Sequence, residues 1–195
     1  MEEEEREKLF PVALKENELM INNEILRFDI NFVSELIYNK MGHLPIYIGP
    51  YPQNSKEIEI LKKDGITAVL NVQSDLDHQH RQINWNFQLK AYKDNLVLIE
   101  RYPIFDFNPE DLINKLKGAG DLLNKLIKEN HTVYVHCTAG MSRAAATVIC
   151  YLYYYQSFSL NDAYEFVKKH RSIICPNLKA IQQVISNQES SFFKI

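Results

Sequence analysis

A cysteine and an arginine that lie close together in the sequence could act on the same anion. The stretch VHCTAGMSRAA, residues 135–145, places Cys137 six residues before Arg143, with Gly140 between them. The apolar residues before the cysteine predict a strand, and the residues from Arg143 onward predict a helix. Backbone N–H groups in front of a helix N-terminus bind oxyanions, and their field favours a cysteine thiolate. The segment therefore predicts a thiolate nucleophile that faces a bound phosphate.

Each residue of this segment has an expected role. Cys137 is the predicted nucleophile, and Arg143 supplies a planar fork that binds two phosphate oxygens better than a lysine would. Gly140 is expected to adopt a backbone conformation that a side chain would hinder. The alternative is a packed strand–helix turn in which the cysteine is only a core residue. The residues expected to bind phosphate are Thr138, Ala139, Gly140, Met141, Ser142 and Arg143.

A thiolate that attacks a phosphate monoester needs a proton donor for the departing oxygen. Asp106 lies between a predicted strand and a long predicted helix, and the loops after parallel strands meet at one edge of a sheet. We therefore predict that Asp106 is the general acid and later activates water against the phosphocysteine. Asp111 is the alternative, although an aspartate in the first turn of a helix commonly complements the helix dipole. His136 points away from Cys137 on its strand, so we interpret its ring as a structural hydrogen-bonding group.

The elements around these residues indicate an α/β fold with a central, mostly parallel sheet flanked by helices. The segment from about residue 23 to residue 40 is expected to be partly helical. We divide the chain into an N-terminal arm (1–44), a catalytic domain (45–190) and a C-terminal tail (191–195), and the arm is expected to cover one side of the domain. Strands are expected at 44–49, 66–72, within 95–104 and at 132–136, and helices at 54–65, 109–130, 143–156, 160–170 and 177–185.

Composition limits the partners and the compartment. The net charge of −3 gives no basic face for nucleic acid, and no apolar stretch is long enough to insert into a membrane. The glutamate-rich start is unlike a secretory or transit peptide, and three cysteines do not form a disulfide framework, so a cytoplasmic location is expected. Cys150 is expected in the core, and a protective disulfide between Cys175 and an oxidised Cys137 is an open alternative. The expected chemistry uses no metal and no cofactor.

These residues resemble the cysteine-dependent, dual-specificity branch of the protein tyrosine phosphatases over about residues 44–190. The sequence HCTAGM followed by RA is similar to the plant glucan (starch) phosphatases and, more distantly, to laforin. Stretches similar in kind and order are YNKMG (38–42), IYIGPYPQ (46–53), LNVQSDLD (70–77), DFNPEDL (106–112) and CPNLKAI (175–181).

The resemblance implies that Cys137 is the nucleophile, Asp106 the acid and Arg143 the phosphate clamp. It also implies that Phe107 lies against a glucan chain, because an aromatic residue stands beside the acid in that family. Sugar rings stack their C–H faces on aromatic side chains, and the other candidates near the expected site are Trp85, Tyr38 and Tyr51. Each of these aromatic residues has core packing as its alternative.

The leading interpretation is hydrolysis of phosphate from a phosphorylated, starch-like polysaccharide. The alternative is a protein phosphatase that acts on phosphotyrosine and on phosphoserine or phosphothreonine. A domain that captures phosphorylated ligands without hydrolysis is a third possibility. The loop residues Thr138, Ala139 and Met141 carry no charge, which disfavours highly phosphorylated inositol head groups.

Overall fold

The computed structural model describes residues 18–21, 24–27 and 36–192, and it forms two compact units, 1–35 and 36–195. In the first unit, β1 (Glu18–Ile21) and β2 (Glu24–Arg27) pair in an antiparallel hairpin. The helix expected within residues 23–40 is wrong for β2 and for residues 39–40, which are strands; residues 28–35 lie outside the described part. The domain boundary at residue 44 stays a prediction.

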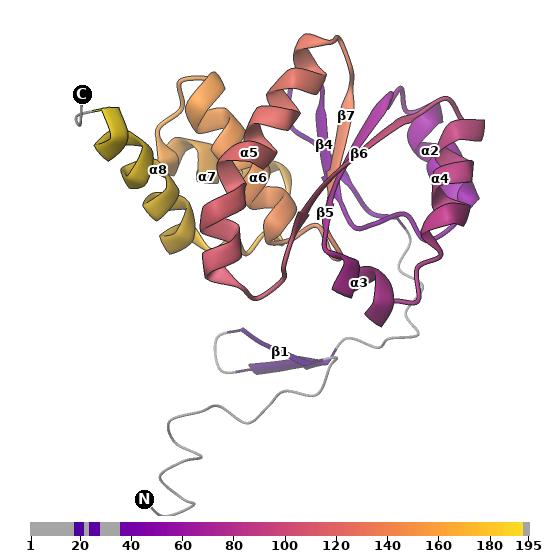
Figure 1. Cartoon of the computed structure of the whole chain (residues 1–195), viewed down its shortest axis with the longest axis horizontal. Coiled ribbons are helices and arrows are strands. Elements are labelled where there is room, and N and C mark those ends of the chain that lie inside the picture. The colour runs from indigo at the N-terminus through magenta and orange to yellow at the C-terminus, as the bar shows by residue number, and fades with distance from the viewer. Residues whose placement is uncertain (1–17, 22–23, 28–35, 193–195) are drawn as a thin grey trace, which may run out of the picture. The chain divides into compact units, whose positions relative to one another are not determined.

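The second unit is built on a five-stranded sheet with the order β3-β4-β7-β5-β6 (Figure 1). Three neighbouring pairs, β4–β7, β7–β5 and β5–β6, are parallel, and β3 pairs antiparallel with β4 at one edge. The fold class predicted from the sequence is therefore confirmed. The strands are β3 (Asn39–Lys40), β4 (Ile46–Gly49), β5 (Ala68–Gln73), β6 (Leu98–Ile104) and β7 (Val133–His136).

The centre of the sheet is buried on both faces because helices cover each of them (Figure 1). Along β7, Val133 and Val135 belong to the larger core cluster and Tyr134 belongs to the smaller one, as alternation along a strand requires. On the larger-core face lie α5 (Pro109–Lys128), α6 (Arg143–Tyr155), α7 (Leu160–His170) and α8 (Leu178–Phe192). On the other face lie α2 (Ser55–Lys63) and α4 (Trp85–Asp94).

Side-chain caps set the starts of the predicted helices. The Asn54 side chain accepts from the N–H of Glu57 at the start of α2, and Asn108 caps α5 with Pro109 in the first turn. The helices predicted from residue 54 onward and the four predicted strands of the parallel part of the sheet are confirmed, although α8 is longer than expected. Among the described residues, no helix combines the length and the apolar character that crossing a bilayer needs.

Two helices occur where no element was predicted from the sequence. Between β5 and β6 the chain forms α3 (Asp75–His80) and then α4, which begins at Trp85. Ser74 caps α3 through a capping box with Asp77, and the Asn84 side chain caps α4. The first of these helices, α3, is short and polar, so it gives little hydrophobic periodicity. Together they bring residues 75–88 to the edge of the sheet at which β5 and β7 end.

Candidate active site

The phosphate loop, residues 137–143, turns its carbonyl groups toward partners outside the loop. Within the described residues, the backbone N–H groups of residues 138–142 have no hydrogen-bond acceptor. A loop with its carbonyls turned out and its amides free is a nest for an anion. The outward carbonyl contacts are Tyr51 N–H to Thr138 O (3.3 Å), Cys175 N–H to Met141 O (2.9 Å), Arg171 Nε–H to Gly140 O (2.9 Å) and Arg171 Nη2–H to Ala139 O (3.2 Å).

Gly140 lets the loop pass close to the neighbouring strand. Its φ is +65°, a conformation that other residues rarely adopt. A Cβ added at Gly140 would lie 2.2 Å from the carbonyl oxygen of Gly49, which ends β4. The expectation that a side chain would hinder this backbone is confirmed, and any substitution here would have to separate the loop from β4.

Cys137 follows the last residue of β7 and is 2% exposed at the entrance to the loop. The preceding His136 is also buried, and its Nδ1 lies 3.2 Å from the Cys137 carbonyl oxygen. Because a carbonyl only accepts, Nδ1 carries the hydrogen. Burial lowers the pKa of His136 to about 3, which keeps the ring neutral at pH 7. The ring of His136 therefore bonds to the loop, as predicted, and does not act as a base.

Arg143 begins α6 and is held by two carboxylates. Its Nη1 and Nη2 donate to the two oxygens of Asp77 at 2.7 and 2.9 Å, and Nη1 also donates to the carbonyl of Ile104 at 2.9 Å. Burial works against the charge, but the hydrogen bonds to Asp77 and the nearby anionic groups raise the pKa of Arg143. Its Nε is buried and has no partner within the described residues. The guanidinium is therefore fixed in place, with one N–H left to bind a ligand.

Asp77 was not predicted, and it connects α3 to the phosphate loop. Besides Arg143, it accepts a hydrogen bond from the Thr138 hydroxyl at 2.7 Å and one from the backbone N–H of Ser74. Burial opposes its charge, yet the hydrogen bonds from Arg143 keep its pKa below the usual range. The S-x-x-D spacing of a capping box marks the start of α3 in the sequence. The ion pair with Arg143, 66 residues away, has no local signal.

Asp106 lies beside the loop arginine, whereas Asp111 supports the backbone. The Asp106 Oδ2 is 2.8 Å from Arg143 Nη2, and its side chain is 34% exposed. Partial burial raises the pKa of Asp106 in spite of Arg143, and the negative charge of Asp77 adds to the rise. The Asp111 carboxylate accepts from the N–H of Phe105 at 2.7 Å and pairs with Lys115. Asp106 therefore combines a raised pKa with contact to the loop arginine, whereas the described contacts of Asp111 are to Phe105 and Lys115.

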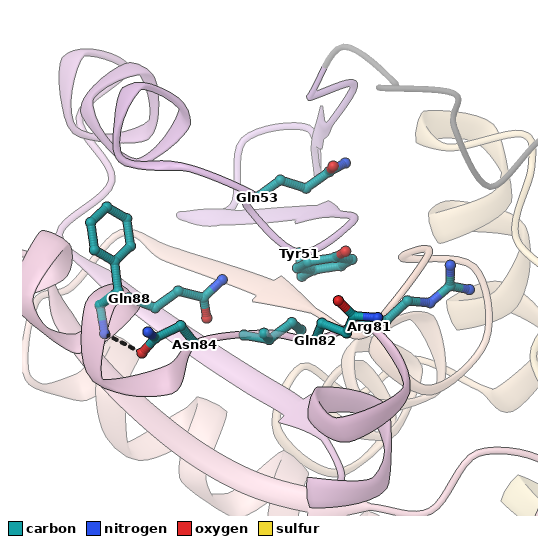
Figure 2. A pocket seen from close by; sticks show the side chains of 8 residues that line it. Tyr51, Gln53, Arg81, Gln82, Asn84 and Gln88 are labelled. Carbon is teal, nitrogen blue, oxygen red and sulfur yellow. Dashed lines mark hydrogen bonds between the residues drawn. The ribbon is translucent and has the colours of Figure 1, made fainter.

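A pocket of about 300 Å³ opens next to the phosphate loop. In Figure 2 the loop after β4, with Tyr51 and Gln53, faces the segment from α3 to α4. Gln88 donates to the carbonyl of Pro52 at 2.8 Å, which ties the two walls together, and the Tyr51 N–H joins the pocket to the phosphate loop. The pocket is lined by Tyr51, Gln53, Arg81, Gln82, Ile83, Asn84, Phe87 and Gln88.

The aromatic residues that were predicted to contact the substrate lie in different surroundings. Tyr51 lines the pocket, and Phe107 is 88% exposed in the turn beside Asp106. Trp85 lies outside the pocket lining; its ring contacts His78, and the Arg101 guanidinium lies 4.9 Å from its centre.

Tyr38 packs edge-on against Tyr47 and Tyr134 and donates to Asp64, so its contacts are those of a core residue. Phe87, which is 55% exposed in the pocket, was not singled out from the sequence. Its position depends on α4, which the sequence pattern did not predict.

The other two cysteines lie apart from the anion nest. Cys150 is buried in α6, as predicted, and burial raises its pKa to about 12. Cys175 is exposed, and both it and Cys137 are free thiols. The backbone of Cys175 bonds to Met141, and the disulfide considered from the sequence stays a prediction.

The strand–loop–helix arrangement of Cys137 and Arg143 is that of a cysteine-dependent phosphatase. Residues 46–190 match the family described as "Dual specificity phosphatase, catalytic domain", and the chain belongs to this family. This family supports the class of enzyme predicted from the sequence, a cysteine-dependent phosphatase.

Three curated relatives extend the comparison. Over 126 residues the chain is 40% identical to the phosphoglucan phosphatase LSF1, chloroplastic, of Arabidopsis thaliana, covering 63% of this chain and 21% of that protein. It is 27% identical over 187 residues to laforin of Mus musculus, covering 86% of this chain and 57% of that protein. It is 31% identical over 145 residues to dual specificity protein phosphatase 9 of Homo sapiens, covering 74% of this chain and 35% of that protein. The chain thus spans from about a fifth to somewhat over half the length of these relatives, and the predicted resemblance is confirmed.

A solved structure shares the fold. The human tyrosine phosphatase-like serine/threonine/tyrosine-interacting protein superposes with a TM-score of 0.63 at 23% identity, covering 80% of this chain and 97% of that one. At this level of identity the likeness supports the fold alone.

Proposed function

We propose that this phosphatase removes phosphate from a phosphorylated glucan through a phosphocysteine intermediate. The Cys137 thiolate attacks phosphorus, and the bond between phosphorus and the sugar oxygen breaks as Asp106 donates its proton to that oxygen. The loop amides and Arg143 hold the three non-bridging oxygens. Water, deprotonated by Asp106, then attacks phosphorus, so that inorganic phosphate leaves and the thiolate returns.

The contacts of Arg143 and Asp106 support these roles. The free Nε of Arg143 and the unpartnered amides of residues 138–142 offer donors to a tetrahedral anion. Asp106 has a raised pKa before any ligand is bound, and a phosphate dianion nearby would raise it further. An acid that keeps its proton beside the leaving group is what the first step needs.

The pocket beside the loop is the observation that carries the glucan substrate. Its lining combines the aromatic rings of Tyr51 and Phe87 with amide side chains and a single cation, Arg81. Sugars bind by stacking C–H faces on aromatic rings, while amides satisfy their hydroxyl groups from both directions. The amide side chains are Gln53, Gln82, Asn84 and Gln88. The 40% sequence identity to the phosphoglucan phosphatase of Arabidopsis thaliana adds support.

The charge of the loop favours a substrate that places a single phosphate group in the active site. The side chains between Cys137 and Arg143 are neutral, and Arg143 is itself shared by Asp77 and Asp106. A head group with several phosphates would need further cations to offset its charge. A sugar monoester on a neutral polymer does not.

The test is phosphate release from phosphorylated amylopectin, compared with phosphotyrosine and phosphothreonine peptides at equal phosphate concentration. The Cys137→Ser variant serves as the blank, and amylopectin freed of phosphate is added to the peptide assays as a competitor. We expect the polymer to be the better substrate and the neutral polymer to inhibit. An enzyme that clears the peptides and leaves the polymer untouched would refute the proposal.

A protein phosphatase is the second candidate, because the chain is 31% identical to a human dual specificity protein phosphatase over 145 residues. The exposed Phe107 and Phe87 would then contact side chains of a phosphoprotein in place of sugar rings. The assay above separates the two candidates. A cytoplasmic location stays a prediction from the composition.

A further inference from the structure

Arg171 is a buried arginine that holds the phosphate loop from outside. It follows α7 and is 3% exposed. Its guanidinium donates to two loop carbonyls, those of Ala139 and Gly140, at 3.2 and 2.9 Å. It also donates to the Asn39 side chain at 2.8 Å and to the Ile37 carbonyl at 3.2 Å. One side chain thus connects the loop to the edge of the sheet at β3.

The partners of Arg171 differ from those of Arg143 in charge. Arg143 is paired with two carboxylates, whereas Arg171 bonds only to carbonyl and amide oxygens, and no ion pair to it occurs within the described residues. Burial lowers the pKa of Arg171, and the nearby Tyr134 and Cys137 act in the opposite direction. A guanidinium remains charged even so. The positive charge behind the loop is therefore not offset by an acid.

The geometry of the peptide bond turns these contacts into an effect on the anion site. In a trans peptide the C=O and the N–H of the following residue point in opposite directions, and no cis peptide occurs in the described chain. A carbonyl of Ala139 held outward therefore directs the Gly140 N–H inward. A carbonyl of Gly140 held outward does the same for Met141.

We propose that Arg171 is a positioning residue of the phosphatase reaction, which orients two loop amides and supplies the uncompensated positive charge that holds the phosphate. The proposal rests on the phosphocysteine chemistry above and does not depend on the glucan substrate. Arg143 fixes one side of the bound phosphate, and Arg171 fixes the loop itself.

The experiment uses the full chain and p-nitrophenyl phosphate, a small substrate that reports loop chemistry whatever the natural substrate is. The variants are Arg171→Met, which removes both the positive charge and the planar guanidinium group, and Arg171→Lys, which keeps the charge but not the guanidinium group. Arg101→Met is the matched control, since Arg101 bonds to Gln73 and to its own carboxylate, Asp75, and not to the loop. Melting temperature, kcat, KM and the inhibition constant for tungstate are measured for each.

We expect Arg171→Met to lower kcat about a hundredfold, as loss of an oriented oxyanion donor does, and to raise the tungstate inhibition constant. Arg171→Lys should recover part of the tungstate affinity but little of kcat, because lysine cannot bridge two carbonyls. Folded Arg171→Met enzyme with unchanged kcat and tungstate inhibition would overturn the proposal.

If Arg171→Met does not fold, Arg171→Lys decides: tungstate inhibition and kcat equal to those of the wild type would overturn the proposal. If the wild type hydrolyses p-nitrophenyl phosphate but not amylopectin phosphate, the glucan proposal fails, and the effects of the Arg171 variants still test this one.

Discussion

The phosphate loop and the pocket beside it use different parts of the chain to bind their ligands. In the loop the contacts are made by backbone: the carbonyls of residues 138–141 are held outward by Tyr51, Arg171 and Cys175, and the amides are free. In the pocket the lining consists of side chains at the ends of two short helices and on the loop after β4. A backbone hydrogen bond from Tyr51 to Thr138 joins the two regions.

This difference separates chemistry from selectivity. Backbone held by a buried partner such as Arg171 cannot adapt, so the loop accepts one shape of ligand, a tetrahedral anion. Exposed side chains such as Phe87 can change with little effect on the fold. Substitutions in the loop should therefore affect every substrate alike, and substitutions in the pocket should change the preference among substrates.

The largest effect is expected from the nucleophile. Cys137→Ser should lower turnover by about 10⁵-fold or more on the glucan, on peptides and on p-nitrophenyl phosphate, because the acceptor of the phosphoryl group is lost. Phosphate release measures this, with the melting temperature as the control for folding. Residual turnover above a few per cent on any of the substrates would contradict the role of Cys137.

The next effect concerns the acid. Asp106→Asn should lower kcat about 10²- to 10⁴-fold for substrates with a poor leaving group. The acid is active when protonated, so wild-type activity should fall as the pH rises through the raised pKa of Asp106, and this alkaline limb should be absent in the variant. Asp111→Asn is the matched control, since Asp111 only accepts from Phe105 and pairs with Lys115. A larger loss of kcat in Asp111→Asn than in Asp106→Asn would reverse the assignment.

Asp77 links the two regions, because it begins α3 and holds Arg143 and Thr138. Asp77→Asn leaves the buried guanidinium without its main partner and should lower the free energy of unfolding by about 3 kcal/mol at pH 7. Because the folded-state pKa of Asp77 is depressed, its contribution is full above the unfolded pKa and is lost as the pH falls below about 4. Urea unfolding at pH 7, at pH 4 and at about pH 2.5 checks this, and a difference between variant and wild type that is as large at the lowest pH as at pH 7 would argue against the depressed pKa.

The smallest effect is expected in the pocket. Phe87→Ala should lower kcat/KM for the glucan about three- to tenfold by removing a stacking surface, and should change the p-nitrophenyl phosphate value less. Leu89→Ala is a suitable control, since it removes another exposed apolar side chain of α4 that does not line the pocket. Equal losses on both substrates would mean that Phe87 acts on the fold and not on the selectivity.

The phosphate loop was easier to predict from the sequence than the pocket. The loop from Cys137 to Arg143, the strands and most helices were predictable because their signals are local: an apolar run, a glycine, a cap or an alternating pattern. Asp77 and Arg171 were not, since each acts through a contact far along the chain, 66 residues to Arg143 and 31 residues to Gly140.

The pocket was the least predictable part. Most of its residues lie between α3 and α4 or in the first turn of α4, where no element was predicted, and Tyr51 reaches them from another segment. Aromatic residue type alone did not separate Tyr51, which lines the pocket, from Tyr38, which packs against Tyr47 and Tyr134.

A crystal structure of the full chain with tungstate tests the central arrangement most directly. The account predicts a tetrahedral anion in contact with the Cys137 sulfur, with its oxygens bonded to the N–H groups of residues 138–142 and to Nε of Arg143. A structure in which the Cys137 sulfur points into the core, with tungstate at a saturating concentration bound elsewhere, would contradict it.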